Sequence, residues 1–244
     1  MVIEYRPVTV TAESTKPVEY RQGRFLTPPG ATEVLLVRHG ESEPARPGRP
    51  FALVDGQDDP ELAPEGHDHA RRVAERLAAE RVDAIYVSSL RRTSQTAAPL
   101  AARLGLTPVV EPELREVYLG EWEGGLFRRM VAEGHPIAER MAAEERWDVI
   151  PGAEPAADFS DRVRVALGRL AAAHPDQRIV VVTHGGVIAE ALAAATGSRP
   201  FAFLGADNGS VSHLVLTEAR WILRRFNDTA HLDPAFSTTA APPT

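Results

Sequence analysis

Short apolar runs recur along the chain, and each is followed by residues that favour a turn. Residues 33–37 read Glu-Val-Leu-Leu-Val, residues 178–183 read Arg-Ile-Val-Val-Val-Thr, and the runs at 84–87 and 108–110 have the same character. A strand with one solvated face alternates apolar and polar positions, whereas an unbroken run of this length is typical of a strand buried on both faces. The pattern therefore predicts a buried, mostly parallel sheet.

Segments with helical periodicity lie between these runs. Residues 66–80 and 157–173 each carry apolar side chains three and four positions apart, which gives a helix one apolar stripe. Residues 213–216 and 221–225 indicate a closing pair of strands joined by a short polar turn. Alternating strands and helices predict the α/β class, here a three-layer α/β/α sandwich with a mostly parallel central sheet.

The same pattern divides the chain into regions. Residues 1–32 indicate an N-terminal extension, in which 8–11 could form an edge strand, and residues 33–232 indicate a single domain. Within the domain, the Ala/Glu/Arg-rich segment 124–151 predicts an inserted helical lid above the sheet edge. The Thr/Ala/Pro-rich residues 233–244 predict a disordered tail.

Composition narrows the classes of function. The formal net charge of −7 argues against nucleic acid and anionic membranes as partners. Lys16 is the only lysine and cysteine is absent, which excludes a P-loop lysine, disulfides, thiolate metal sites and a cysteine nucleophile. The N-terminus has no long apolar run typical of a signal or an anchor, so we expect a cytoplasmic location.

Two histidines stand where ligands bind in an open parallel sheet, directly after strands. His39 follows the first predicted strand and His184 follows the strand at 178–183, and each precedes a glycine that lets backbone come close to a ligand. Gly185 also begins the next predicted helix, whose N-terminus favours an anion. One such histidine is usually structural, but two matched ones beside Arg38 favour a site.

Two further segments carry charged side chains at strand ends. Residues 88–97, Ser-Ser-Leu-Arg-Arg-Thr-Ser-Gln-Thr-Ala, place Arg92 at the start of a helix. Residues 114–124, Leu-Arg-Glu-Val-Tyr-Leu-Gly-Glu-Trp-Glu-Gly, include Glu116. Taken singly, the arginine is typical of solvated surface and the acidic run is typical of a loop.

These segments, in this order, resemble the histidine phosphatase superfamily, also called phosphoglycerate-mutase-like, over residues 33–225. The resemblance implies that His39 becomes phosphorylated, that Arg38, Arg92, His184 and Gly185 hold the phosphoryl group, and that Glu116 donates a proton. Within the Ser-x-Leu-x-Arg pattern it favours Arg92 over Arg91, which we expect to point outward.

These residue types suit phosphoryl transfer, which needs an in-line nucleophile, cationic donors and a proton for the leaving alcohol. A histidine attacks only when neutral and held in one tautomer. Guanidinium groups match phosphate oxygens two at a time and can replace a metal ion. We therefore expect no metal and no cofactor, and a metal-independent phosphomonoesterase that acts on a small phosphorylated metabolite through a phosphohistidine.

A mutase and a non-catalytic phospho-ligand-binding scaffold remain alternatives. The resemblance favours hydrolysis, because no lysine-bearing loop follows Glu116 as it does in phosphoglycerate mutases, and residues 120–124 resemble the phosphatase branch. The complete set of site residues argues against a scaffold. The partner is thus a small-molecule phosphate ester, and a homodimer through the N-terminal extension is possible.

Further residues are weaker candidates for the substrate pocket: Glu41, Ser42, Trp122 and Asn208. Ser42 stands near the place where many members of the family carry an asparagine. Trp147 could also line the pocket, although aromatic residues more often pack in the core. His231 either folds back near the pocket mouth or belongs to a surface tail. His67 and His69 form no metal pair, because residues two apart on a helix point away from each other.

Overall fold

The computed structural model describes residues 20–233 and 235 and contains a six-stranded central sheet in the order β5-β4-β6-β1-β7-β8. Strands β5, β4, β6 and β1 are parallel neighbours, whereas β7 is antiparallel to β1 and β8 is antiparallel to β7. Their bounds are β1 Thr32–Arg38, β4 Ala84–Val87, β5 Val109–Val110, β6 Arg178–Thr183, β7 Val211–Leu216 and β8 Trp221–Asp228. The predicted mostly parallel sheet and the closing strand pair are confirmed.

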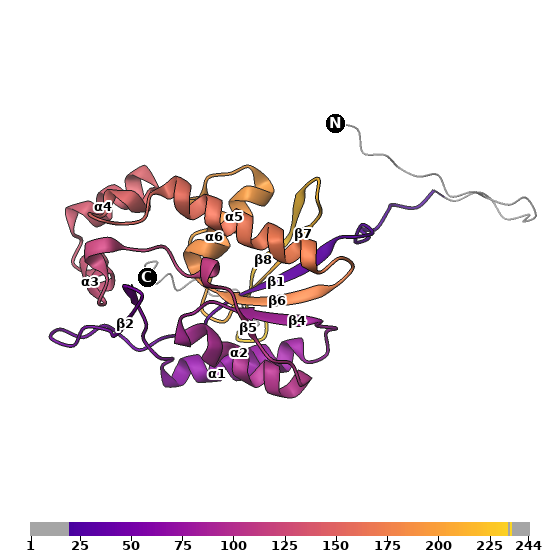
Figure 1. Cartoon of the computed structure of the whole chain (residues 1–244), viewed down its shortest axis with the longest axis horizontal. Coiled ribbons are helices and arrows are strands. Elements are labelled where there is room, and N and C mark those ends of the chain that lie inside the picture. The colour runs from indigo at the N-terminus through magenta and orange to yellow at the C-terminus, as the bar shows by residue number, and fades with distance from the viewer. Residues whose placement is uncertain (1–19, 234, 236–244) are drawn as a thin grey trace, which may run out of the picture.

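Helices cover both faces of this sheet, as Figure 1 shows. On one face lie α1 (Pro64–Leu77) and α2 (Arg91–Leu104), which pack against each other and share one apolar core with the sheet. On the other face lie α5 (Ala156–Ala173) and α6 (Gly185–Thr196), which belong to a second, larger core. The predicted three-layer α/β/α sandwich is therefore confirmed.

The register of the sheet brings the predicted site residues together. Arg38 at the end of β1 pairs with Thr183 at the end of β6, and Val87 at the end of β4 pairs with Val182. Because these strands are parallel, the residues that follow them emerge at one edge of the sheet. His39, Ser88 and His184 are thus neighbours in space.

The lid segment crosses beyond this edge of the sheet (Figure 1). Residues 124–151 contain the short helices α3 (Leu126–Ala132) and α4 (Pro136–Glu144) and the 3-10 turn η3 (Trp147–Val149). Ala138, Met141, Trp147 and Ile150 belong to the larger apolar core. The lid is therefore packed onto the domain through its own side chains.

The hydrophobic pattern did not predict the long connection between β1 and α1. It contains a small antiparallel pair, β2 (Leu53–Val54) and β3 (Gln57–Asp58). Two-residue strands are too short to give a periodic signal. The single-turn helices η1 (Pro112–Leu114), η2 (Gly120–Trp122) and η4 (Pro200–Phe203) escaped prediction for the same reason.

Element boundaries differ from prediction by only a few residues. Helix α1 begins at Pro64 rather than at residue 66, since proline suits a first helical turn where its missing N–H is not needed. Ala63 provides no side-chain cap, as expected for alanine. The edge strand predicted at residues 8–11 lies outside the described residues, as does most of the predicted tail. None of the helices described is long and apolar enough to span a bilayer.

Candidate active site

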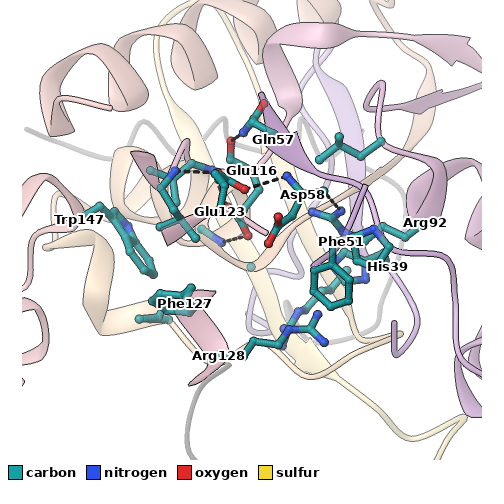
Figure 2. Close-up of a pocket in the computed structure, with 18 of the residues that line it drawn as sticks. His39, Phe51, Gln57, Asp58, Arg92, Glu116, Glu123, Phe127, Arg128 and Trp147 are labelled. Carbon is teal, nitrogen blue, oxygen red and sulfur yellow. Dashed lines mark hydrogen bonds between the residues drawn. The ribbon is translucent and has the colours of Figure 1, made fainter. Parts of the chain in front are cut away.

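A cavity opens at the edge of the sheet (Figure 2). The C-terminal end of β1 and the N-terminal end of α6 lie on one side of it, and the lid lies on the other. Its inner end is lined by Arg38, His39, Arg92, Glu116, Gly185 and Gly186. These residues come from four separate segments of the sequence. The fold therefore gathers most of the predicted site residues around one space.

His39 is buried and held in one tautomer. Its Nδ1 lies 2.7 Å from the carbonyl oxygen of Gly40, to which it can only donate, so Nε2 carries the lone pair. Burial lowers the pKa of His39 well below 6.5, and the positive charges of Arg92 and Arg38 lower it further. The imidazole is consequently neutral at neutral pH.

The backbone around His39 is fixed from both sides. Its carbonyl oxygen accepts a hydrogen bond from Asn208 Nδ2 at 2.8 Å, and its N–H donates to Thr183 O at 3.0 Å. A Cβ on Gly40 would lie 2.9 Å from the Cα of Gly66 in α1. The glycine after His39 is thus required by helix packing, and its close approach to a ligand stays a prediction.

Two guanidinium groups flank His39. Arg38 donates to Ala206 O at 2.5 Å, and Arg92 donates to Asp58 O at 2.7 Å. Burial lowers the pKa of Arg92 to about 10, which leaves it charged at neutral pH. Arg91 instead faces outward and pairs with Asp59 and Glu61, as expected. Of the adjacent Arg91 and Arg92, only Arg92 lines the cavity.

His184 lies directly behind His39 and caps the N-terminus of α6. The two ring centroids are 5.2 Å apart with an angle of 60° between the planes. His184 is fully buried, and this burial lowers its pKa well below 6.5, helped by the charge of Arg92. Its Nε2 lies 2.8 Å from the hydroxyl oxygen of Ser88. Ser88 is the first residue of the Ser-x-Leu-x-Arg pattern, and the sequence predicted no role for it.

Glu116 reaches the cavity from the loop between η1 and η2. Its carboxylate accepts hydrogen bonds from Gly186 N at 3.2 Å and from Val117 N at 3.0 Å. Its backbone carbonyl accepts from Gln57 Nε2 at 2.7 Å and from Arg162 Nη2 at 2.8 Å. The carboxylate is therefore held beside the N-terminus of α6, the helix that begins directly after His184.

The weaker pocket candidates lie elsewhere. Trp122 is buried in the core, and Asn208 supports the backbone of His39; neither lines the cavity. Glu41 and Ser42 also lie off the cavity wall, where Ser42 Oγ accepts from Arg128. None of these four side chains lines the cavity. Trp147, in contrast, does line the cavity.

His231 folds back, although away from the catalytic cavity. Its Nε2 lies 2.9 Å from the carbonyl oxygen of Gly209, and it lines a separate cavity between α1 and the β7–β8 pair. The Gly209 N–H donates to Arg38 O at 3.0 Å. His231 therefore packs behind the loop that supports His39, so its placement at the pocket mouth was wrong.

Arg128 is a cavity residue that sequence reasoning missed. It comes from α3 in the lid and donates to Glu43 O at 2.9 Å and to Ser42 Oγ at 2.7 Å. Its charge also lowers the pKa values of His39 and Arg92. The neighbouring Arg129 is exposed and pairs with Glu133. Only the orientation of the helix distinguishes these adjacent arginines.

Asp58 and Glu123 join the connection after β1 to the loop around η2. Both Asp58 oxygens accept backbone N–H groups, from Gly124 and Gly125, while Glu123 accepts from Asp58 N at 2.7 Å and Leu119 N at 2.8 Å. Burial raises the pKa of Glu123 to about 7 and also raises that of Asp58. Each residue lines the cavity.

A strand-end histidine pair between arginines, on a mostly parallel sheet, defines a phosphate-handling α/β enzyme. Residues 34–229 match the model of the histidine phosphatase superfamily, branch 1, and the chain belongs to this family. The family predicted from the sequence motifs is confirmed.

Curated relatives and solved structures agree with this assignment. The chain is 35% identical over 205 residues to a metal-independent phosphoserine phosphatase of Arabidopsis thaliana, covering 82% of this chain and 83% of that protein. It is 35% identical over 208 residues to phosphoglycerate mutase-like protein 4 of the same plant, with coverages of 82% and 87%. A mycobacterial glucosyl-3-phosphoglycerate phosphatase structure superposes with a TM-score of 0.67 at 29% identity, covering 82% of this chain and 100% of that one. The chain is a hydrolase of phosphate monoesters.

Proposed function

We propose that this phosphomonoesterase hydrolyses a small phosphorylated metabolite without a metal ion, through a covalent phosphohistidine on His39. The observation that carries the proposal is the hydrogen bond from His39 Nδ1 to Gly40 O, which leaves the Nε2 lone pair of a neutral imidazole between Arg38 and Arg92. A neutral, tautomerically fixed histidine in a cationic pocket is a nucleophile suited to phosphorus.

The reaction proceeds in two displacements. In the first, Nε2 of His39 forms a bond to phosphorus while the bond to the ester oxygen breaks, and Glu116 gives its proton to the leaving alcohol. In the second, water attacks phosphorus, the nitrogen–phosphorus bond breaks, and Glu116 takes a proton from the water. The products are the alcohol and inorganic phosphate, and the enzyme returns to its initial state.

Cationic side chains provide the charge stabilisation in this proposal. Arg38, Arg92 and Arg128 all line the cavity that holds His39. At a separation of about 4 Å and an effective dielectric constant near 20, each unit charge pair contributes about 4 kcal/mol. Three such groups can stabilise the phosphoryl oxygens in the transition state without a metal ion.

Hydrolysis, and not transfer between two hydroxyl groups, is the function that we propose, although relatives named as phosphoglycerate mutases or mutase-like also match over 82% of the chain. Proteins named as phosphatases match over most of the chain. The lid supplies a cation to this cavity, Arg128, although no lysine follows Glu116. The preference for hydrolysis therefore rests on the relatives and on residues 120–124, and no longer on a missing charge.

The decisive experiment measures phosphate release from a panel of monoesters in the presence of EDTA. We expect turnover by the wild type and a loss of at least about 1,000-fold in His39→Ala, as for removal of a nucleophile. His67→Ala, which alters an exposed histidine on α1, is the matched control and should retain activity. Quenching with alkaline denaturant should trap a phosphoenzyme that is base-stable and acid-labile.

Two outcomes would contradict the proposal. Unchanged turnover in His39→Ala would exclude His39 as the nucleophile, and a strict requirement for added metal would exclude metal independence. The remaining sequence-based predictions, a cytoplasmic location, a homodimer and the absence of nucleic-acid and membrane partners, stay predictions.

A further inference from the structure

The cavity continues from His39 toward an apolar wall. The lid and the loop after η4 contribute Phe127, Met141, Trp147 and Leu204, and the long connection after β1 contributes Phe51. Figure 2 shows Phe127 and Trp147 on the side of the cavity away from His39 and Arg92. A phosphoryl group held at His39 therefore directs its leaving alcohol toward these side chains.

The aromatic part of this wall is held in place by other rings. Phe127 and Trp147 have ring centroids 6.0 Å apart, and Trp147 lies 5.0 Å from Phe201 behind it. Trp122 supports Phe127 from the core at 6.3 Å. Such a wall is formed before the ligand arrives, so it provides apolar contact area without a further ordering of side chains.

The charged groups beside this wall already have protein partners. Asp58 and Glu123 each accept two backbone N–H groups. Arg128 is bound to the loop after His39, and its guanidinium carbon lies 5.3 Å from the centroid of Phe51. A charged alcohol would have to compete with these contacts, whereas an apolar alcohol only displaces water from apolar surface.

We propose that the preferred substrates are phosphate monoesters whose alcohol carries an apolar or aromatic body. This inference rests on the proposed function and adds the class of leaving group. It sets the chain apart from a phosphatase for a small zwitterionic or acidic alcohol such as serine or glycerate. The discriminating contacts are those of Phe127 and Trp147.

The test compares kcat/KM for 2-phenylethyl phosphate, ethyl phosphate and O-phosphoserine. The first two are both unactivated alkyl esters, so their difference reports contact with the ring and not leaving-group reactivity. We expect 2-phenylethyl phosphate to exceed each of the others by about tenfold or more, the scale expected for burying a ring. A preference for O-phosphoserine, or equal values for the two alkyl esters, would overturn the inference.

Variants assign the preference to the wall. Phe127→Leu and Trp147→Ala should lower the ratio of kcat/KM for 2-phenylethyl phosphate to kcat/KM for ethyl phosphate. Phe203→Ala, which removes a ring that packs on Phe226 outside the cavity, should leave the ratio unchanged. An unchanged ratio in Phe127→Leu, which should fold, sinks the assignment, while loss of all phosphate release sinks the proposed function instead.

A second inference concerns His184. Its Nδ1 is buried and has no hydrogen-bond partner among the described residues, although its ring is a neighbour of the His39 ring at 5.2 Å. Buried polar atoms in native proteins are rarely left without a partner. A phosphoryl oxygen on the neighbouring His39 would be one such partner for Nδ1.

The contacts of Ser88 bear on which nitrogen of His184 carries the proton, because the Ser88 hydroxyl can donate either to His184 Nε2 or to Thr93 Oγ1, which lies 3.1 Å away. Ser88 Oγ accepts the N–H of Leu90 at 3.2 Å, and Thr93 Oγ1 uses its own proton on Leu90 O at 2.8 Å. The shortest contact left for the Ser88 hydroxyl proton is His184 Nε2 at 2.8 Å. If Ser88 donates there, the neutral imidazole must carry its proton on Nδ1.

The geometry points to Ser88 as a positioning residue that keeps Nδ1 of His184 protonated, ready to donate to a phosphoryl oxygen on His39. This role also rests on the proposed function. Without the hydroxyl, Nε2 loses its donor and the other tautomer, with a bare Nδ1 facing the phosphoryl oxygens, becomes populated. Ser88 itself touches no reacting atom.

A double-mutant cycle and a spectroscopic readout test this role. Ser88→Ala should lower kcat/KM by about 10-fold to 100-fold, within the range for loss of one oriented donor, while Ser89→Ala serves as the neighbouring control. In a His184→Ala background, Ser88→Ala should add nothing, because it acts through His184. Nitrogen NMR of the wild type should show the proton on Nδ1. Additive losses, or a proton on Nε2, would overturn the inference.

Discussion

At the scale of single residues, the site depends on burial to set protonation states. Desolvation and the neighbouring arginines keep both His39 and His184 neutral, which is the state that their proposed roles as nucleophile and single-nitrogen donor require. Glu116 is held by the N–H groups of Val117 and Gly186. Hydrogen bonds to neighbouring groups therefore hold each of these side chains in place.

Gly186 gives a test of Glu116 at this scale. In Gly186→Ala the new Cβ would collide with Glu116 Oε1 and lie 3.3 Å from Phe159 Cζ. Displacing the carboxylate should lower kcat/KM for ethyl phosphate, which reports phosphorylation of His39 and not the later hydrolysis, by about 10-fold to 100-fold, as for loss of a general acid. The kcat/KM for p-nitrophenyl phosphate should fall much less, because its leaving group needs no proton. Steady-state kinetics with both esters measures the difference.

The control for this prediction is another helical glycine. A Cβ on Gly168 in α5 would meet nothing within 4 Å, so Gly168→Ala should leave both rates unchanged and, by helix propensity, increase stability slightly. An equal loss with both esters in Gly186→Ala would mean that Glu116 is not the proton donor.

At the scale of elements, the lid and the loop after His39 are joined by one side chain. Arg128 in α3 reaches Ser42 Oγ and Glu43 O, and its charge faces the catalytic residues. The lid thus contributes both an apolar wall and a cation to a cavity whose inner end is built by the sheet.

Arg128→Ala should weaken both contributions. We expect kcat/KM to fall by about tenfold or more, since a partly desolvated cation contributes several times what an exposed one does. Hydrogen exchange in residues 126–132 should become faster because α3 loses its tie to the loop. Arg129→Ala, which removes an exposed arginine paired within the same helix, is the matched control. Equal effects of the two substitutions would contradict this role of Arg128.

At the scale of the whole molecule, burying neutral histidines makes stability depend on pH. The pKa of His39 is lowered in the folded chain, so below pH 6.5 the unfolded chain binds the proton first. The free energy of unfolding then falls as pH falls below 6.5, and above 6.5 the imidazole is neutral in both states. Glu123, whose pKa is raised to about 7, acts with the opposite sign between its ordinary 4.5 and 7.

A comparison of variants isolates the histidine contribution. The melting temperature of His39→Asn relative to wild type should rise as pH is lowered from 7 to 5.5, because the variant lacks the titrating group and retains the contribution of Glu123. Thermal unfolding followed by circular dichroism measures this difference. The exposed His67→Asn serves as the control substitution. A parallel pH dependence of His39→Asn and wild type would contradict the predicted protonation state of His39.

A feature could be predicted from the sequence where it depends on residues that are close together in the chain. The strand runs at 33–37 and 178–183 and the helical stripes predicted the layers, because periodic burial is written directly into the sequence. The strand-end motifs located His39, Arg92, Glu116 and His184, because parallel strands bring their carboxyl ends together. The short pair β2–β3 and the close packing of Gly40 against Gly66 could not be predicted, because both depend on contacts between distant segments.

The sequence by itself determined the class of fold, the family and the residues that converge on the cavity, since order, spacing and residue type carry that information. Only the tertiary structure decided that Arg128 and not Arg129 enters the site, that Trp147 and not Trp122 lines it, and that Ser88 is bound to His184. These outcomes follow from the direction in which each side chain leaves its element. That direction is set by packing against parts of the chain that are remote in sequence.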